Sequence, residues 1–156
     1  MGAKILMSTT TWDPQLAAVI REIMEQRIPF NRHLGVRVAE LARGYARMEI
    51  PFKPELIGDP FRPAIHGGVL STLIDTCGGA AAFTMITPPE TVSTIDLRVD
   101  YLRPGEQKTL VCESTVSRMG NRVASVDGKI YHPDAPDRLI ATGKAVYNVK
   151  RSKERE

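Results

Sequence analysis

Asp75 is the one acidic residue of RPAIHGGVLSTLIDTCGGAAAF, a segment of mostly small and apolar side chains at residues 62–83. An ionised carboxylate in apolar surroundings costs several kcal/mol unless it is paired or protonated. Folds therefore seldom keep such a group for packing alone. Asp75 is predicted either to have a hydrogen-bonding partner or to take part in a reaction.

His66, Gly67 and Gly68 precede this carboxylate, where a loop is expected to become a helix that runs from about Gly67 to about Met85. The first N–H groups of a helix lack partners within it, and the helix dipole adds positive charge there. Without side chains, these amides can donate to a carbonyl that becomes an oxyanion under attack. Alternatively, the two glycines only permit a tight turn into the helix.

The segments before this helix predict a helix and a hairpin. Residues 14–28 have apolar side chains at helical spacing, with Asp13 as the cap and Pro14 in the first turn. The following PFNRHLG breaks that pattern. VRVAEL and YARMEI, at 36–41 and 45–50, alternate with period two and predict a hairpin. Four prolines in residues 51–63 predict a fixed loop that is neither strand nor helix.

Four segments after the helix predict long strands. One buried helix among six strands indicates an α+β fold, in which an antiparallel six-stranded sheet wraps around the helix. We expect a single domain over residues 1–156, with a core at about 30–148 and frayed tails at 1–10 and 150–156. The four segments are 91–103, 108–119, 121–132 and 138–150.

Composition excludes several classes of function. The net charge is only +3, and the cations are spread out, so no nucleic-acid partner is expected. No segment approaches the ~20 apolar residues of a membrane span, and the first residues do not resemble a signal peptide, so a cytoplasmic location is expected. Cys77 and Cys112 belong to no metal-binding cluster and are predicted to be small buried side chains.

Two stretches, HGGVLSTLID and STIDLRVDYLRPG, the latter at residues 93–105, resemble hotdog-fold acyl-CoA thioesterases of the phenylacetyl-CoA type, which carry an HGG motif. The resemblance covers about residues 30–148. It implies hydrolysis of a medium-chain or aryl acyl-CoA, with coenzyme A as part of the substrate and no metal or other cofactor. It also implies a homodimer with its active sites at the subunit interface, often paired into a tetramer.

The same resemblance assigns roles to individual residues. Gly67 would donate its N–H to the oxyanion, and Asp75 would face the partner's Gly67 as the nucleophile or as the general base on water. His66 would orient the substrate, although a purely structural histidine is equally compatible with the sequence. The Ser93 hydroxyl would hold the attacking water, with Thr94 as the neighbouring alternative.

The sequence departs from the family in one respect. Several relatives have an Asn or Gln a few residues before the His, whereas this chain offers only Asp59 and Arg62 there. Asp59 is the candidate substitute.

The remaining ligand contacts are expected from cations and apolar side chains. Arginine suits phosphate because its planar fork donates two parallel hydrogen bonds, although ordinary solubilising charge explains the same residues. Candidate contacts to coenzyme A phosphates are Arg98, Arg103, Arg118 and Arg122, and candidate contacts to the acyl group are Phe61, Ile65, Val69 and Phe83.

Three alternative functions keep the same fold. The enzyme could release acyl groups from a carrier protein, or the domain could be a non-catalytic acyl-CoA sensor or assembly module. A hotdog dehydratase fits less well, because its working base is usually a His in a different motif. A sensor has no need of an acid at position 75, so Asp75 favours an enzyme.

Overall fold

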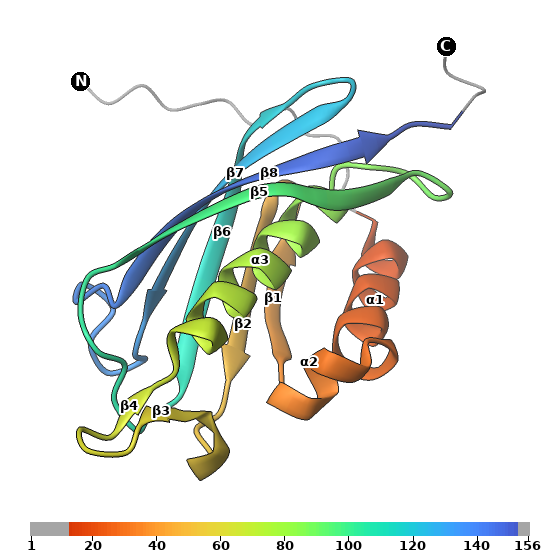
Figure 1. The fold of residues 1–156 in the computed structure, drawn as a ribbon. Helices are drawn as coiled ribbons and strands as arrows, with labels where there is room; N and C mark the ends of the chain where they lie inside the picture. The colour runs from red at the N-terminus through yellow and green to blue at the C-terminus, as the bar shows by residue number, and fades with distance from the viewer. Residues whose placement is uncertain (1–12, 153–156) are drawn as a thin grey trace.

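The computed structural model describes residues 13–152. Its main feature is a six-stranded antiparallel sheet that curves around one long helix, which confirms the predicted α+β hotdog fold (Figure 1). The predicted hairpin and all four later strands are present. In spatial order the strands are β1 (Arg37–Ala42), β2 (Tyr45–Ile50), β6 (Leu110–Met119), β7 (Val123–Tyr131), β8 (Ala141–Lys150) and β5 (Thr91–Tyr101).

The central helix α3 (Gly67–Phe83) crosses the concave face of this sheet (Figure 1). It is apolar on several sides because the sheet surrounds it, and Leu73 and Ile74 are almost completely buried. Cys77 and Cys112 are free and fully buried, as predicted. The core therefore lies between α3 and the sheet.

A depression in the sheet receives Ile74. Gly128 on β7 and Gly143 on β8 are directly paired across the two strands. A Cβ at Gly143 would lie 2.7 Å from Ile74 Cγ2, and one at Gly128 would lie 3.3 Å from the same atom. The two glycines thus leave the space that Ile74 fills, and this contact fixes the rotation of α3 immediately before Asp75.

The N-terminal helix ends earlier than predicted. Asp13 caps α1 (Pro14–Glu22) through a hydrogen bond from the Gln15 N–H. A π-helical turn, Ile23–Arg27, follows, and the segment expected to break the pattern forms a second short helix, α2 (Pro29–Leu34). Pro29 has no N–H to donate, and the Met24 carbonyl accepts instead from Asn31 Nδ2 at 3.0 Å. This side-chain substitution supports the irregular turn.

The proline-rich segment is more ordered than the predicted loop. It contains a short 3₁₀ helix, Pro54–Leu56, and a small hairpin of β3 (Ile57–Asp59) and β4 (Ala64–Ile65). Gly58 makes this possible, because a Cβ there would lie 2.6 Å from the His66 Cα. The His66 N–H donates to the Leu56 carbonyl at 2.8 Å. The segment therefore holds the residues that begin α3.

Part of the predicted C-terminal tail is anchored. The Arg151 guanidinium donates to the carbonyls of Gly120 and Asn121 and forms a 3.1 Å ion pair with the buried Glu90. Within the predicted tail 150–156, Arg151 therefore contacts the β6–β7 turn and Glu90. The rest of that tail, 153–156, and the N-terminal tail lie outside the described residues.

The two edges of the sheet differ. At the β1 edge, the Val38 N–H donates to Glu25 Oε1 at 2.7 Å and the Val38 carbonyl accepts from Arg21, so the first helices cover this strand. At the opposite edge, β5 pairs with β8 on one side only within residues 13–152. In the same part of the chain, no helix is long and apolar enough to cross a membrane.

Candidate active site

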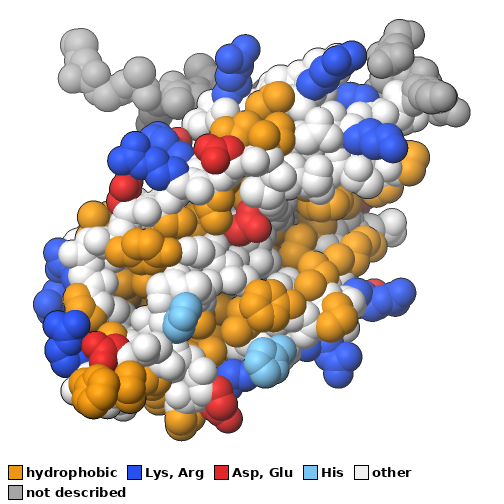
Figure 2. Space-filling view, viewed as in Figure 1, with side chains coloured by type: hydrophobic (Ala, Val, Ile, Leu, Met, Phe, Trp, Pro, Cys, Tyr) orange, Lys and Arg blue, Asp and Glu red, His pale blue; other side chains and the backbone are white. Residues whose placement is uncertain are grey.

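Asp75 lies on α3, two turns from its N-terminus, and is half-buried. It faces a cavity of about 350 Å³ between α3, the start of β5 and the first helices. Figure 2 shows hydrophobic side chains gathered on this hollowed face. The cavity is lined by a mainly apolar set that includes Met24, Ile28, Phe30, Phe83 and Val92, with Asp75 as the acidic member.

Two hydroxyl groups hold Asp75. Thr94 Oγ1 donates to Asp75 Oδ1 at 2.8 Å. The Tyr147 hydroxyl lies 2.7 Å from the main-chain carbonyl of Asp75 and 3.4 Å from Oδ1, and it donates to both. Thr94 and Tyr147 are directly paired between β5 and β8. The predicted partners of the carboxylate therefore come from the sheet.

A β-bulge decides which hydroxyl of β5 reaches the carboxylate. The register shifts between Thr94 and Asp96, so one extra residue, Ile95, interrupts the alternation. Thr94 thus shares the inner face with Leu97. Ser93 borders the cavity, but it pairs with the exposed Asn148, and the alternation turns its side chain to the other face. In this chain, the contact to Asp75 is made by Thr94.

At the start of α3, His66 is the helix cap. Its Nδ1 accepts the Gly68 N–H at 2.8 Å, so the Gly68 amide is already engaged. Within the described residues, the Gly67 N–H has no acceptor. Of the two predicted oxyanion donors, Gly67 is therefore the available one, and His66 orients this end of the helix.

Tyr101 and Ser71 contact the carbonyl side of Gly67. The Tyr101 hydroxyl donates to the Gly67 carbonyl at 3.3 Å and also bonds to the Ser71 hydroxyl. A Cβ on Gly67 would lie 3.3 Å from the Tyr101 ring. An aromatic side chain of β5 thus holds the carbonyl side of Gly67, the residue whose own N–H is free.

Gly67 and Asp75 cannot act on the same carbonyl within one chain. They are eight residues apart on a continuous helix, which separates them by about 12 Å along its axis. A reacting carbonyl needs both groups within hydrogen-bonding reach. A site that uses both groups would therefore need a second chain.

Asp59 and Arg62 are used by the β3–β4 turn. Asp59 Oδ1 accepts the N–H groups of Phe61 and Arg62 at 3.0 and 3.1 Å, and Oδ2 pairs with the Arg62 guanidinium. These backbone hydrogen bonds hold the pKa of Asp59 below its ordinary value. Asp59 shapes the turn and does not contact Asp75 in the same chain.

The four candidate arginines do not form one cluster. Arg118 and Arg122 line a small cavity at the β6–β7 turn. Arg103 follows the other end of β5, about 30 Å from Thr94 along the strand, and Arg98 pairs with Asp100 at 3.1 Å. One chain thus presents positive charge at both ends of the sheet.

Of the candidate acyl contacts, only Phe83 lines the Asp75 cavity. Ile65 and Val69 are buried in the core. Phe61 lies in the β3–β4 turn and is 92% exposed. The residues that sequence reasoning missed, Met24, Ile28 and Phe30, come from the first helices, whose position over the cavity leaves no pattern in the sequence.

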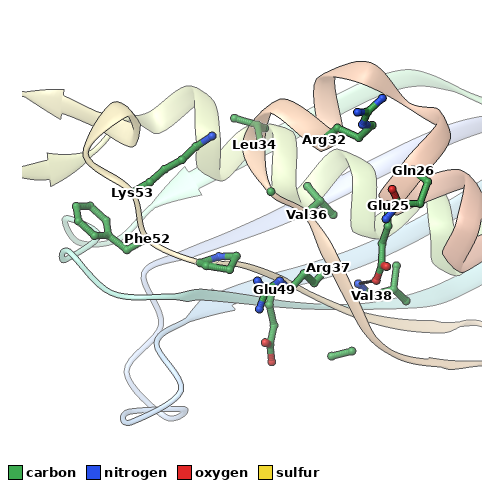
Figure 3. Close-up of a pocket in the computed structure, with 13 residues that line it drawn as sticks. Glu25, Gln26, Arg32, Leu34, Val36, Arg37, Val38, Glu49, Phe52 and Lys53 are labelled. Carbon is green, nitrogen blue, oxygen red and sulfur yellow. Dashed lines mark hydrogen bonds between the residues drawn. The ribbon is translucent and has the colours of Figure 1, made fainter.

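A larger cavity, about 700 Å³, lies at the β1 edge of the sheet (Figure 3). Its polar lining combines Glu25 and Glu49 with Arg32, Arg37 and Lys53. It contains none of the predicted site residues. Within residues 13–152, no cluster of three or more His, Cys, Asp or Glu side chains could hold a metal ion.

Comparison with known proteins agrees with this architecture. A family model described as the thioesterase superfamily matches residues 63–138. The medium/long-chain acyl-CoA thioesterase YigI of Escherichia coli K12 is 30% identical over 156 residues, 92% of this chain and 99% of YigI. A solved thioesterase family protein from Silicibacter pomeroyi has a TM-score of 0.80 at 25% identity, covering 88% of this chain and 99% of its own.

The PaaI protein of the Escherichia coli phenylacetic acid degradation operon shares the fold, with a TM-score of 0.76 at 19% identity over 88% of this chain and 95% of PaaI. The fold and these relatives together define a hotdog protein of the thioesterase class. The chain belongs to the thioesterase superfamily. The family resemblance of the HGG motif and the enzyme class that it implies are confirmed.

Proposed function

We propose that the protein hydrolyses acyl-CoA thioesters at sites built from two copies of the chain. The observation that carries this proposal is the separation of Gly67 from Asp75 on one helix. A second, antiparallel copy of α3 would bring its free Gly67 amide opposite Asp75, and the two-fold symmetry would build a second, identical site. The open edge of β5 is the natural place for the sheets to join.

The chemistry follows from these groups. As a general base, Asp75 takes a proton from water while the water oxygen attacks the thioester carbonyl. The Gly67 N–H of the partner subunit stabilises the resulting oxyanion. The C–S bond then breaks, and the thiolate of coenzyme A leaves and takes up the proton. Alternatively, the carboxylate attacks first, and water hydrolyses the acyl-enzyme anhydride.

We propose a medium- or long-chain aliphatic acyl group as the substrate. The cavity beside Asp75 is lined by flexible or aliphatic side chains such as Met24, Ile28 and Val92, with phenylalanines at its borders. YigI, the relative that matches over nearly its whole length, is named for this substrate class. The exposed arginines at the ends of the sheet would supply contacts to coenzyme A phosphates.

A pair of substitutions at Gly67 tests the oxyanion donor. Gly67→Pro removes the N–H, and proline is well tolerated at the first position of a helix. The extended conformation of His66, with ψ of 133°, also suits a following proline. We expect kcat on lauroyl-CoA to fall about 100-fold or more, whereas Gly67→Ala, which keeps the amide, should stay within a few-fold.

Mixing two inactive variants tests the shared site. Gly67→Pro and Asp75→Asn damage opposite halves of each site, so a mixed dimer contains one site with both defects and one intact site. Random exchange should restore about a quarter of wild-type activity. No recovery in a verified mixed dimer would overturn the two-chain site. Saturable acyl-CoA binding without thiol release by the wild type would instead favour a binding module.

A further inference from the structure

Tyr147 combines deep burial with contact to the proposed catalytic carboxylate. It is 2% exposed, on β8, and its hydroxyl bridges the main-chain carbonyl and the side chain of Asp75. Thr94 contacts only the side chain. Tyr147 therefore holds both the position of the residue on the helix and the direction of its carboxylate.

One glycine of α3, Gly78, makes room for this tyrosine. A Cβ at Gly78 would collide with the Tyr147 hydroxyl, whereas a Cβ at Gly79 would make an ordinary contact, 3.6 Å from the ring. The stretch CGGAAAF gives this helix little side-chain bulk, but backbone does not fill the space beside Gly78. Instead, an aromatic side chain occupies the space, and Gly78 is the residue that its hydroxyl requires.

The tyrosine is held in its donating form. Burial raises its pKa, and the negative charge of Asp75 raises it further. The other titratable groups acting on it are the buried thiols of Cys77 and Cys112. The hydroxyl thus remains a hydrogen-bond donor across the pH range in which a thioesterase is assayed.

We propose that Tyr147 is a positioning residue for Asp75, seated in a slot that Gly78 provides. This role rests on the proposed function, in which Asp75 acts on the thioester or on water. The hydroxyl orients the carboxylate toward the cavity. Its removal should therefore affect turnover more than substrate binding.

Tyr147→Phe is the first test, because it keeps the ring and removes only the hydroxyl. We expect kcat on lauroyl-CoA to fall about tenfold with KM nearly unchanged. Tyr45→Phe is the matched control: its hydroxyl donates to another carboxylate, Glu113, at 2.8 Å on the outer face of the sheet, and its kcat should not change.

The slot is tested through Gly78. Gly78→Ala should lower kcat as Tyr147→Phe does. In the Tyr147→Phe background, the added Cβ meets only ring carbons at 3.3 and 3.4 Å. Gly78→Ala should therefore cause much less further loss there than in the wild type.

The outcomes separate the two proposals. If Asp75→Asn keeps its activity, the proposed function is wrong. If Asp75→Asn is inactive while Tyr147→Phe has wild-type kcat, only the positioning role is overturned. A lower melting temperature with unchanged kinetics would show that Tyr147 serves packing alone, and it would overturn the proposal too.

Discussion

The hydrogen bond from Thr94 to Asp75 gives a prediction at the scale of one residue. Thr94→Val keeps the shape of the side chain and removes the donor that lies 2.8 Å from Asp75 Oδ1. We expect kcat/KM on acyl-CoA to fall about tenfold, as is typical for a hydrogen bond to a charged group. Ser93→Ala should stay within about twofold. Steady-state thiol release measures both variants, and the reverse ranking would give the role to Ser93.

The choice between these hydroxyls shows where sequence reasoning stops. The family resemblance implies Ser93, with Thr94 as the neighbouring alternative, and strict alternation would indeed place Ser93 on the same face as Leu97. The bulge at Ile95 adds one residue and brings Thr94 to that face instead. No residue type in this stretch marks a bulge. In contrast, Asp75 stands out as a charged side chain in an apolar helix, and Gly67 stands out as a poor helix former at the start of that helix.

At the scale of elements, the packing of Ile74 on α3 against Gly143 on β8 can be tested by a double-mutant cycle. Gly143→Ala places a Cβ 2.7 Å from Ile74 Cγ2 and 3.2 Å from the Arg98 carbonyl, and such overpacking should lower the free energy of unfolding by about 1–3 kcal/mol. Ile74→Ala should cost about 2–5 kcal/mol. The double variant should lose less than the sum, because the truncated side chain leaves room for the new methyl group.

Denaturant unfolding of the wild type, the two single variants and the double variant measures this coupling. Gly79→Ala is the control, because it also adds a methyl group at a glycine but makes only an ordinary contact. If the losses in free energy of unfolding simply add, the contact between Ile74 and Gly143 does not position the helix. A coupling of about 1 kcal/mol or more would show that it does.

The sequence predicts the regular helices and strands well and the irregular elements poorly. The hairpin, the long strands and α3 follow from periods of two and from an apolar run. The π-helical turn was missed because it depends on Asn31 reaching the Met24 carbonyl, a contact between side chain and backbone that no spacing encodes. The β3–β4 hairpin was missed because proline content outweighed the single small residue, Gly58, that permits it.

At the scale of the whole molecule, the outer face of the sheet gives a prediction for acid stability. Burial acts to raise the pKa of Glu113, but hydrogen bonds from Lys129 and Tyr45 outweigh it, and the pKa lies below its ordinary value of 4.5. The ionised Glu113 therefore stabilises the folded protein fully above pH 4.5, and this stabilisation is lost as the pH falls below that value.

Glu113→Gln should accordingly lower the melting temperature near neutral pH, and its difference from the wild type should shrink at about pH 3. Thermal unfolding across this pH range measures the effect, with Glu55→Gln as a control at an exposed glutamate outside the sheet. A difference that stays constant with pH would show that Glu113 contributes by packing rather than by charge.

The buried cysteines have a practical consequence for measuring the reaction. Burial, followed by contact with Cys77, raises the pKa of Cys112, and Cys77 Sγ donates to the Ala46 carbonyl at 3.3 Å. A chromogenic thiol reagent should therefore find no target on the folded protein and report only the coenzyme A that is released. Enzyme can be used at substrate-like concentrations, where a first-turnover burst would reveal a covalent acyl-enzyme and a linear start would indicate direct attack by water.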